Sequence, residues 1–261
     1  MIISLFQRKD TMIYGNTMAS VYDALNDGID TKAWADFICS AFGKYSEKDI
    51  NKICEIACGT GSMAIEMAKR GFDVTASDLS TEMLTEAEFK ARDADTSIRF
   101  VSSDMRSFSL YTKADAVLCL LDSMNYLTKP SDFAETLTSV YKNLSDGGLF
   151  IFDINSKHKF ENTYGDNAYV IENEGVLCAW QNFYNPKTKI CDFYLSIFTE
   201  NEDGSYERTD EHQRERMYTM RSVRKMLADA GFEICGIFSD YDFSEGCEDT
   251  DERLYIVTKK I

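Results

Sequence analysis

Apolar and polar positions along this 261-residue chain follow two periods, and the dominant period changes near residue 160. Up to that point, short apolar runs typical of buried strands alternate with segments in which apolar residues recur every three or four positions. The predicted strands cover 52–57, 73–77, 98–102, 114–118 and 149–153, and the predicted helices between them cover 62–69, 80–94 and 131–144. Alternation of this kind predicts right-handed crossovers and a parallel sheet with helices on both faces.

Helical spacing also marks the fifty residues before the first strand. Val21, Tyr22 and Leu25 form one apolar stripe, and a second stripe begins at Trp34. These helices could cover a ligand that binds at the edge of the sheet. Residues 1–11 are expected to form a loose tail.

Beyond residue 160 the period falls to two, which is typical of half-buried strands. The predicted strands cover 168–174, 176–184, 189–200 and 206–218. The third strand has an apolar and a polar face, made by Cys191, Phe193, Leu195 and Ile197 and by Asp192, Tyr194 and Ser196. From Met220 a helix and strands near 233–238 and 253–258 resume the α/β pattern, so the antiparallel part is predicted to be a cap on one domain.

Charge and composition narrow the class of protein. Lys and Arg total 28 against 44 Asp and Glu, a formal charge of −16, and this field repels phosphate backbones, so no nucleic-acid partner is expected. No apolar run reaches ~18 residues, and the N-terminal charges follow the apolar patch, the reverse of a secretory signal. We expect a cytoplasmic protein without a membrane partner. Eight cysteines without a Cys-x-x-Cys pair, and only two histidines, predict reduced structural thiols and no metal site.

The candidate chemistry lies in the first strand–turn–helix unit, ICEIACGTGSMAIEM. Gly59 and Gly61 allow a sharp turn and close approach of a ligand, and the helix from Ser62 points free N–H groups at that spot. Asp78, at the end of the second strand, lies where a carboxylate can hold two ribose hydroxyls. The spacing Gly59-x-Gly61-x-x-Ala64 also fits a permissive dinucleotide motif, so a nicotinamide or flavin dinucleotide competes as the ligand.

Three details favour another ligand. Glu55 places a carboxylate at the tip of the first strand, where a pyrophosphate is repelled and an ammonium is attracted. Asp104, just past the third strand, suits an adenine amino group. The helices before the first strand could cover the pocket. These features predict a ligand with adenosine at one end and a cationic amino acid at the other, and S-adenosylmethionine fits that description.

The chain resembles the class I S-adenosylmethionine-dependent methyltransferases of the small-molecule branch that carry a β-rich cap. The motifs that carry the resemblance are VYDAL (21–25), EIACGTG (55–61), VTASDLSTEML (74–84), SSDMRSF (102–108), ADAVLCLLDSMNYL (114–127), LSDGGLFIFDIN (144–155) and ERLYIVTKK (252–260). The match spans nearly the whole chain. It implies a Rossmann-like α/β fold with a mostly parallel seven-stranded sheet, an antiparallel last strand and an antiparallel β cap inserted in the C-terminal half.

The resemblance also implies a division of the chain. Residues 1–51 would form N-terminal helices closing the cofactor pocket, 52–159 with 219–261 the cofactor-binding core, and 160–218 the cap that contacts the substrate. The residues that would bind S-adenosylmethionine are Tyr22, Trp34, Glu55, Ala57, Cys58, Gly59, Gly61, Asp78, Leu79, Met83, Asp104, Met105 and Leu120. Glu55 would meet the ammonium, Asp78 the ribose and Asp104 the adenine N6.

The sequence defines the site of the methyl acceptor less clearly than the site of the methyl donor. Asp122, Ser123, Asn125 and Tyr126 follow an apolar strand and are candidates to orient the acceptor, although helix capping and turn formation explain them equally well. Asp122 and His212 are the candidates for a general base. His212 is one residue out of register with the His-x-x-Arg-x-Tyr spacing of relatives, which on a strand turns a side chain to the other face.

The cap offers two further features. Arg208, Asp210, His212, Arg214 and Arg216 alternate along the last cap strand, either as a basic stripe for an anionic substrate group or as a solvated ladder, which we favour. Trp180, with Phe183 and Tyr194, could wall the substrate pocket or form the core of the cap, and we favour core.

Together these observations predict a methyltransferase acting on a small-molecule acceptor, by N- or O-methylation, with S-adenosyl-L-homocysteine as the product. The alternatives are an NAD(P)-dependent oxidoreductase, which would use the same turn, and a non-catalytic S-adenosylmethionine-binding protein.

Overall fold

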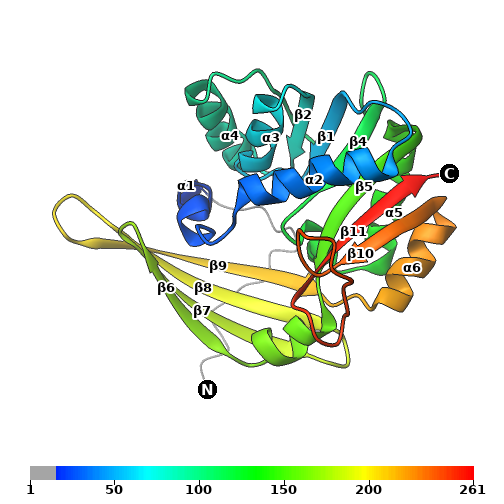
Figure 1. Ribbon diagram of the computed structural model, residues 1–261. Helices are drawn as coiled ribbons and strands as arrows, with labels where there is room; N and C mark the ends of the chain where they lie inside the picture. Colours follow the sequence, from blue (N-terminus) through cyan, green and yellow to red (C-terminus); the bar gives the residue numbers. More distant parts are fainter. Residues whose placement is uncertain (1–15) are drawn as a thin grey trace.

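The computed structural model describes residues 16–261 (Figure 1), so the tail expected at 1–11 lies outside the described residues. Seven strands form one sheet in the order β10-β11-β5-β4-β1-β2-β3, and four form a second sheet in the order β6-β7-β8-β9. The strands of the first sheet are β1 (Lys52–Ile56), β2 (Asp73–Asp78), β3 (Arg99–Ser102), β4 (Ala114–Cys119), β5 (Leu144–Asn155), β10 (Phe232–Phe238) and β11 (Arg253–Lys260). Those of the second are β6 (Ala168–Asn173), β7 (Val176–Asn185), β8 (Ile190–Glu200) and β9 (Tyr206–Arg216).

The large sheet is parallel except at one edge. β1 pairs in parallel with β2 and β4, whereas β11 runs antiparallel to both β5 and β10. The chain moves outward from β1 to β3 and then crosses to β4 on the other side of β1. In open α/β sheets, ligands bind at such a reversal, beyond the carboxyl ends of the strands. The end of β1 is therefore the expected site.

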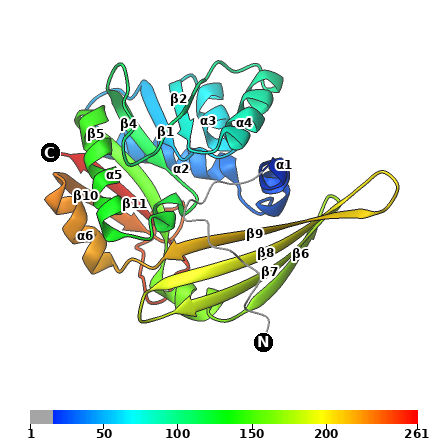
Figure 2. The same ribbon diagram turned by 180° about the vertical axis from the view of Figure 1, so that it is seen from behind.

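Helices cover both faces of this sheet (Figures 1 and 2). The helices are α1 (Asn16–Leu25), α2 (Thr31–Tyr45), α3 (Ser62–Lys69), α4 (Thr81–Asp93), α5 (Pro130–Asn143) and α6 (Met220–Asp229), with short turns η1 (Ser123–Tyr126) and η2 (Lys159–Tyr164). Alternate residues of β1 point to opposite layers. Ile53 packs with α2 and α3, and Cys54 and Ile56 pack with α5 and α6.

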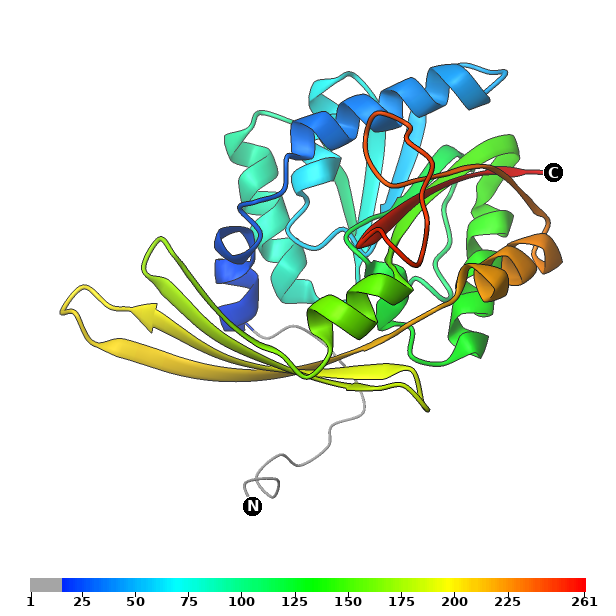
Figure 3. The same ribbon diagram turned by 60° about the horizontal axis from the view of Figure 1, so that its bottom comes forward.

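The second sheet is a curved cap that lies across the carboxyl ends of the parallel strands (Figures 1 and 3). As predicted, Cys191, Phe193, Leu195 and Ile197 of β8 are buried on one face. That face packs against Met18 of α1 and other apolar residues of α1, η2 and α4. We call it the inner face of the cap, and the opposite one the outer face. The inner face carries the apolar burial that holds the cap on the core.

Apart from shifts of one or two residues at element ends, the structure differs from the predicted elements at β5 and at the short turns η1 and η2. β5 begins at Leu144 and not at 149, because the strand follows α5 directly and Leu144 already pairs with Ala114. The π-helical turn η2, at Lys159–Tyr164, was not predicted because a six-residue turn has too little periodicity to detect. Across residues 16–261, no helix is long and apolar enough to cross a membrane.

Candidate active site

The turn after β1 is held in a tight left-handed conformation. Ala57, Gly59 and Gly61 have φ values of 53°, 54° and 75°. A Cβ added to Gly61 would lie 2.9 Å from the Cβ of Ala87 in α4, so this turn and α4 can pack only around a glycine. Ala57 shows that one left-handed position here tolerates a side chain, at some cost in strain.

Asp78 fixes the turn from the neighbouring strand. Its Oδ2 accepts a hydrogen bond from Gly59 N at 2.8 Å, and its Oδ1 accepts one from Ser80 N at 2.9 Å. Burial raises the pKa of this carboxyl, and the backbone N–H groups act in the opposite sense. The carboxylate thus ends β2 beside the glycine turn, where it can also accept bonds from ligand hydroxyls.

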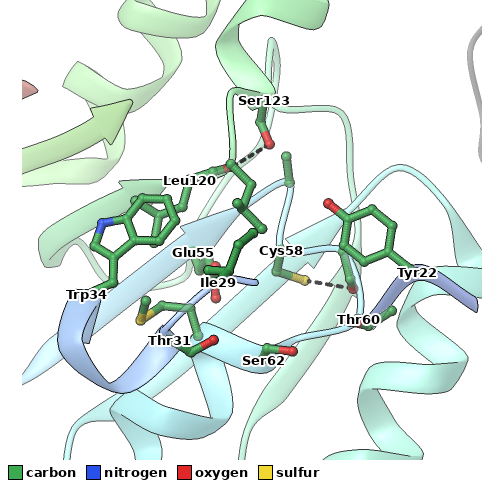
Figure 4. Close-up of a pocket in the computed structure, with 14 residues that line it drawn as sticks. Tyr22, Ile29, Thr31, Trp34, Glu55, Cys58, Thr60, Ser62, Leu120 and Ser123 are labelled. Carbon is green, nitrogen blue, oxygen red and sulfur yellow. Dashed lines mark hydrogen bonds between the residues drawn. The ribbon is translucent and has the colours of Figure 1, made fainter. Parts of the chain in front are cut away.

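A cavity opens between this turn, α1, α2 and the loop after β4 (Figure 4). Tyr22 and Trp34 lie on opposite sides of it, with Glu55 and Cys58 between them. Its remaining lining comes from Ile29, Thr31, Ala57, Gly59, Thr60, Ser62, Met63, Leu120, Leu121 and Ser123. The sequence predicts that Tyr22, Trp34, Glu55 and the glycine turn contact one ligand, and in the structure all of them line one cavity.

Glu55 is the acidic side chain that lines the cavity. It is 4% exposed, and within residues 16–261 its Oε2 has no hydrogen-bond partner. Burial raises the pKa of Glu55 to about 8, because the Ala64 N–H offsets only part of the lost hydration and the Asp78 charge adds to the shift. A buried carboxylate oxygen without a partner fits a cationic ligand group. Together with Asp78 for a ribose, these residues fit S-adenosylmethionine.

The aromatic walls of the cavity come from the N-terminal helices. Trp34 packs face to face with Tyr241 at 5.9 Å between ring centroids and edge to face with Tyr255 at 5.4 Å. Tyr22 is half-buried, and loss of hydration together with the Asp122 and Asp78 charges raises the pKa of its phenol. Both walls are aromatic rings, against which an apolar part of a ligand can pack.

A polar clasp joins α1 to the glycine turn and to α4. Thr60 Oγ1 donates to Asp23 Oδ1 at 2.6 Å, and Lys90 Nζ contacts Asp23, Thr60 and Ser62. Lys90 donates to Ser62 Oγ at 2.7 Å. The clasp holds α1, and hence Tyr22, over the cavity.

The four residues that are expected to contact adenine lie at several different places in the fold. The Asp104 carboxylate receives the Arg106 guanidinium at 2.9 Å, and this partner holds the pKa of Asp104 below its usual range despite partial burial. Leu79 is 40% exposed, and Met105 packs on the edge of the core. Met83 is fully buried between α4, α1 and the cap. Contacts of these four residues with adenine stay predictions.

The loop after β4 carries a buried ionic network. Leu121 and Asp122 have φ values of 55° and 49°, left-handed geometry that is strained for such residues. Asp122 Oδ1 pairs with Arg253 at 2.9 Å, Arg253 also pairs with Asp153, and Asp122 N donates to Asp153 Oδ2 at 2.9 Å. Asp153 is 0% exposed. The sequence does not predict Arg253 and Asp153 as site residues, because no sequence motif indicates an ion pair between β5 and β11.

The predicted substrate residues have defined structural partners. Asn125 donates to Arg216 O and accepts from Asn155 N, both at 2.9 Å, so it ties the core to the cap. Tyr126 OH donates to Gln213 Oε1 at 3.1 Å. Trp180 lies against Tyr164 and Phe193 on the inner face, in line with the favoured core interpretation. Contact of these side chains with an acceptor stays a prediction.

The structure places His212 away from the cavity. It pairs across the cap with Tyr194, stacks on that ring at 4.5 Å and hydrogen-bonds Asp192 at 2.9 Å. These residues occupy the outer face, since their neighbours Phe193 and Gln213 are buried on the inner one. A general-base role for His212 is therefore wrong for this geometry, and the one-residue register shift is the reason. Phe183 and Tyr194 also lie on the outer face, not in the cap core.

The alternating charged positions of β9 share that outer face. Arg208 pairs with Asp210, and Arg214 lies 3.5 Å from Asp192. The solvated ladder is thus what the structure contains, and the basic stripe does not face the cavity.

Comparisons with known proteins agree with the donor site. A family model described as a methyltransferase domain matches residues 53–148. A putative methyltransferase of Geobacillus sp. strain WCH70 is 31% identical over 239 residues, covering 92% of this chain and 96% of that protein. A glycine/sarcosine N-methyltransferase of Aphanothece halophytica is 27% identical over 225 residues, covering 82% of this chain and 78% of that protein.

Among solved structures, an S-adenosylmethionine-dependent methyltransferase from Clostridium acetobutylicum ATCC 824 superposes with a TM-score of 0.85 at 30% identity. The match covers 94% of this chain and 98% of that one, cap included. The shared sheet order, the Glu55 and Asp78 carboxylates and the sequence identity over nearly the full length lead to one conclusion. The chain belongs to the class I S-adenosylmethionine-dependent methyltransferases, enzymes that transfer a methyl group from this donor.

Proposed function

We propose that the enzyme methylates the nitrogen of a small-molecule amine. The observation that carries the proposal is the charge beside the donor cavity. Three carboxyl groups, Asp122, Asp153 and Glu215, face two cations, Arg253 and Lys159, in one buried network. When all three carboxyl groups are ionised they exceed the two cations by one charge. A positively charged acceptor can balance that charge in place of a proton shared between two of the carboxyl groups, whereas a neutral alcohol cannot.

The similarity to a glycine/sarcosine N-methyltransferase supports a small amine as acceptor. The strong negative charge of the whole chain, −16, also favours a cationic acceptor over an anionic one. S-adenosylmethionine, when bound, supplies an electrophilic methyl carbon on its sulfonium sulfur. The protein's own task is then to align the nitrogen, exclude water and remove a proton.

The proposal includes a division of labour along the chain. The N-terminal helices within residues 1–51 close over the donor, and the clasp of Asp23, Thr60 and Lys90 supports this. Residues 52–159 with 219–261 hold the donor, and residues 160–218 form the cap that selects the acceptor. The inner face of the cap carries the residues that selection requires.

The test is a transfer assay with matched acceptors. Formation of S-adenosylhomocysteine is measured with glycine, ethanolamine, putrescine and glucosamine, and with glycolate, ethylene glycol, 1,4-butanediol and glucose as their hydroxyl counterparts. We expect turnover with at least one amine and none with its counterpart. Turnover with the hydroxyl compounds alone would contradict the proposal.

Donor binding itself should depend on pH through Glu55. The carboxyl has a pKa of about 8 in the free protein, and the donor's ammonium needs the carboxylate, so binding at pH 7 is expected to release about one proton. Affinity should rise close to tenfold per pH unit from 6 to 8 and level off above, where Glu55 is already ionised. Calorimetry of S-adenosylhomocysteine in buffers of different ionisation enthalpy measures the released proton.

Glu55→Gln should abolish the proton release, and Glu88→Gln, on the exposed face of α4, should leave it unchanged. Equal proton release in Glu55→Gln and wild type would show that another group titrates.

A further inference from the structure

Glu215 lies at the point where the cap meets the ionic network of the core. It stands on the inner face of β9, opposite Cys191, and is 3% exposed. Asn155 Nδ2 donates to Glu215 Oε2 at 2.9 Å and also to Tyr164 OH at 3.0 Å. A side-chain hydrogen bond joins Glu215 to Asp122. Two carboxyl groups can hydrogen-bond only by sharing a proton, and such a proton relieves the repulsion between their charges.

The pair adjoins the donor cavity. Leu121 and Ser123, on either side of Asp122, line that cavity, and the Asp122 charge reaches the phenol of Tyr22, which lines it too. The strained left-handed backbone at Leu121 and Asp122 holds the Asp122 carboxylate between the cavity and the cap. Glu215 is thus a cap residue that interacts directly with a residue beside the donor cavity.

Two buried polar atoms near the pair have no partner within residues 16–261. Gln213 Nε2 is a free donor on the inner face of β9, two residues before Glu215, in a side chain that is 7% exposed. Asp153 Oδ1 is a free acceptor in a side chain that is 0% exposed. Buried polar atoms are nearly always satisfied in folded proteins. A buried donor and a buried acceptor that lack partners close to one network indicate that a polar ligand can bind there.

We propose that Asp122 and Glu215 bind the acceptor's ammonium group and that Glu215 takes its proton before methyl transfer. The inference rests on the proposed N-methylation and names the residue that makes it possible. An ammonium has no lone pair and cannot attack carbon. Binding of the ammonium displaces the proton shared by the pair to solvent, so that both carboxylates face R–NH₃⁺. Transfer of one proton from R–NH₃⁺ to the Glu215 carboxylate then gives R–NH₂, whose lone pair forms the N–C bond while the C–S electron pair passes to sulfur. The products are R–NH₂⁺–CH₃ and the thioether, and Glu215 then returns its proton to water.

The surroundings of Glu215 suit a base. Burial and the neighbouring Asp122 raise the pKa of its carboxyl well above the usual range, while Asn155 and Lys159 act in the opposite sense. Tyr164 and Cys191 also face it, and burial together with the Glu215 charge raises the pKa of both. A carboxylate with a raised pKa is a stronger base, and an arriving cation stabilises its charged form.

Glu215→Gln is the decisive variant because it preserves shape and hydrogen bonding. The new amide oxygen can still accept from Asn155, and the new NH₂ can still donate to Asp122, as the shared proton does. Glu207→Gln, the same change at an exposed position of β9, is the matched control. The assay is kcat/KM for the best amine of the panel above, from pH 6.5 to 9.5, together with the Kd for S-adenosylhomocysteine.

In wild type, the pair binds the ammonium form, so kcat/KM should level off once Glu215 is ionised. The Glu215→Gln enzyme cannot deprotonate a bound ammonium and can use only the neutral amine that is present in solution. Its kcat/KM should therefore keep rising tenfold per pH unit. We expect a deficit of about 10²-fold at pH 7 that shrinks towards pH 9.5, with the Kd unchanged within twofold. The control should match wild type.

A deficit that is the same at every pH, or no deficit, would overturn the role of Glu215 and leave N-methylation standing. Failure of wild type to methylate any amine of the panel would overturn the proposed function, and the inference with it.

Discussion

Asp78→Ala is expected to weaken binding of S-adenosylmethionine by about 10²-fold or more. The substitution removes the carboxylate that accepts from Gly59 N and Ser80 N, and with it the partner for the donor's ribose. Each hydrogen bond to a charged group is worth about 1.5–3 kcal/mol, and two such losses exceed the ~2.7 kcal/mol that corresponds to 10²-fold in affinity. Calorimetric titration with S-adenosylmethionine, S-adenosylhomocysteine and NADPH measures the effect.

Asp73→Ala is the matched control, because Asp73 begins the same strand and is exposed. It should bind both adenosyl ligands as wild type does, and neither variant should bind NADPH. An Asp78→Ala protein whose Kd stays within threefold of wild type would show that this carboxylate does not hold the donor.

Arg253→Leu is expected to destabilise the fold by about 3–5 kcal/mol at pH 8. It removes the partner that Asp122 and Asp153 share and leaves the fully buried Asp153 as an uncompensated charge. For a chain of this size the loss corresponds to a fall in Tm of roughly 10 °C. Urea and thermal unfolding at several pH values measure it.

The deficit should shrink as the pH falls. Burial and the Asp122 charge raise the pKa of Asp153 even with Arg253 present, and loss of Arg253 should raise it further. A carboxyl whose folded pKa is raised binds its proton more tightly in the folded state, so its stabilising contribution is lost as pH rises through that pKa. The variant should therefore be closer to wild type at pH 5 than at pH 8.

Two further variants identify the cause. Adding Asp153→Asn to Arg253→Leu removes the buried charge and should recover part of the stability, and Arg221→Leu on the exposed face of α6 should cost under 1 kcal/mol. A deficit that does not change with pH and is not relieved by Asp153→Asn would mean that lost packing, not the unpaired carboxylate, causes it.

The sequence by itself determined the donor half of this protein. The alternation of apolar runs and helical stripes predicted the parallel sheet. The period of two predicted the cap, with Cys191, Phe193, Leu195 and Ile197 on its covered face. Glu55, the glycine turn and Asp78 lie within 24 residues of one another, on consecutive strands of one crossover unit. Their geometry follows from local chain conformation and from strand pairing between neighbours, so spacing alone could place them.

Only the tertiary structure decided the acceptor half. Asp122, Asp153, Glu215 and Arg253 come from four separate segments, 31 to 131 positions from Asp122, and meet because β11 pairs with β5 while β9 lies over η1. The local hydrophobic periodicity of the sequence carries no information about such long-range contacts. The choice between His212 and Glu215 depended on which residues of β9 face inward, and adjacent positions on a strand face opposite sides. Register and long-range pairing, which local sequence does not encode, set the buried charges that surround the acceptor.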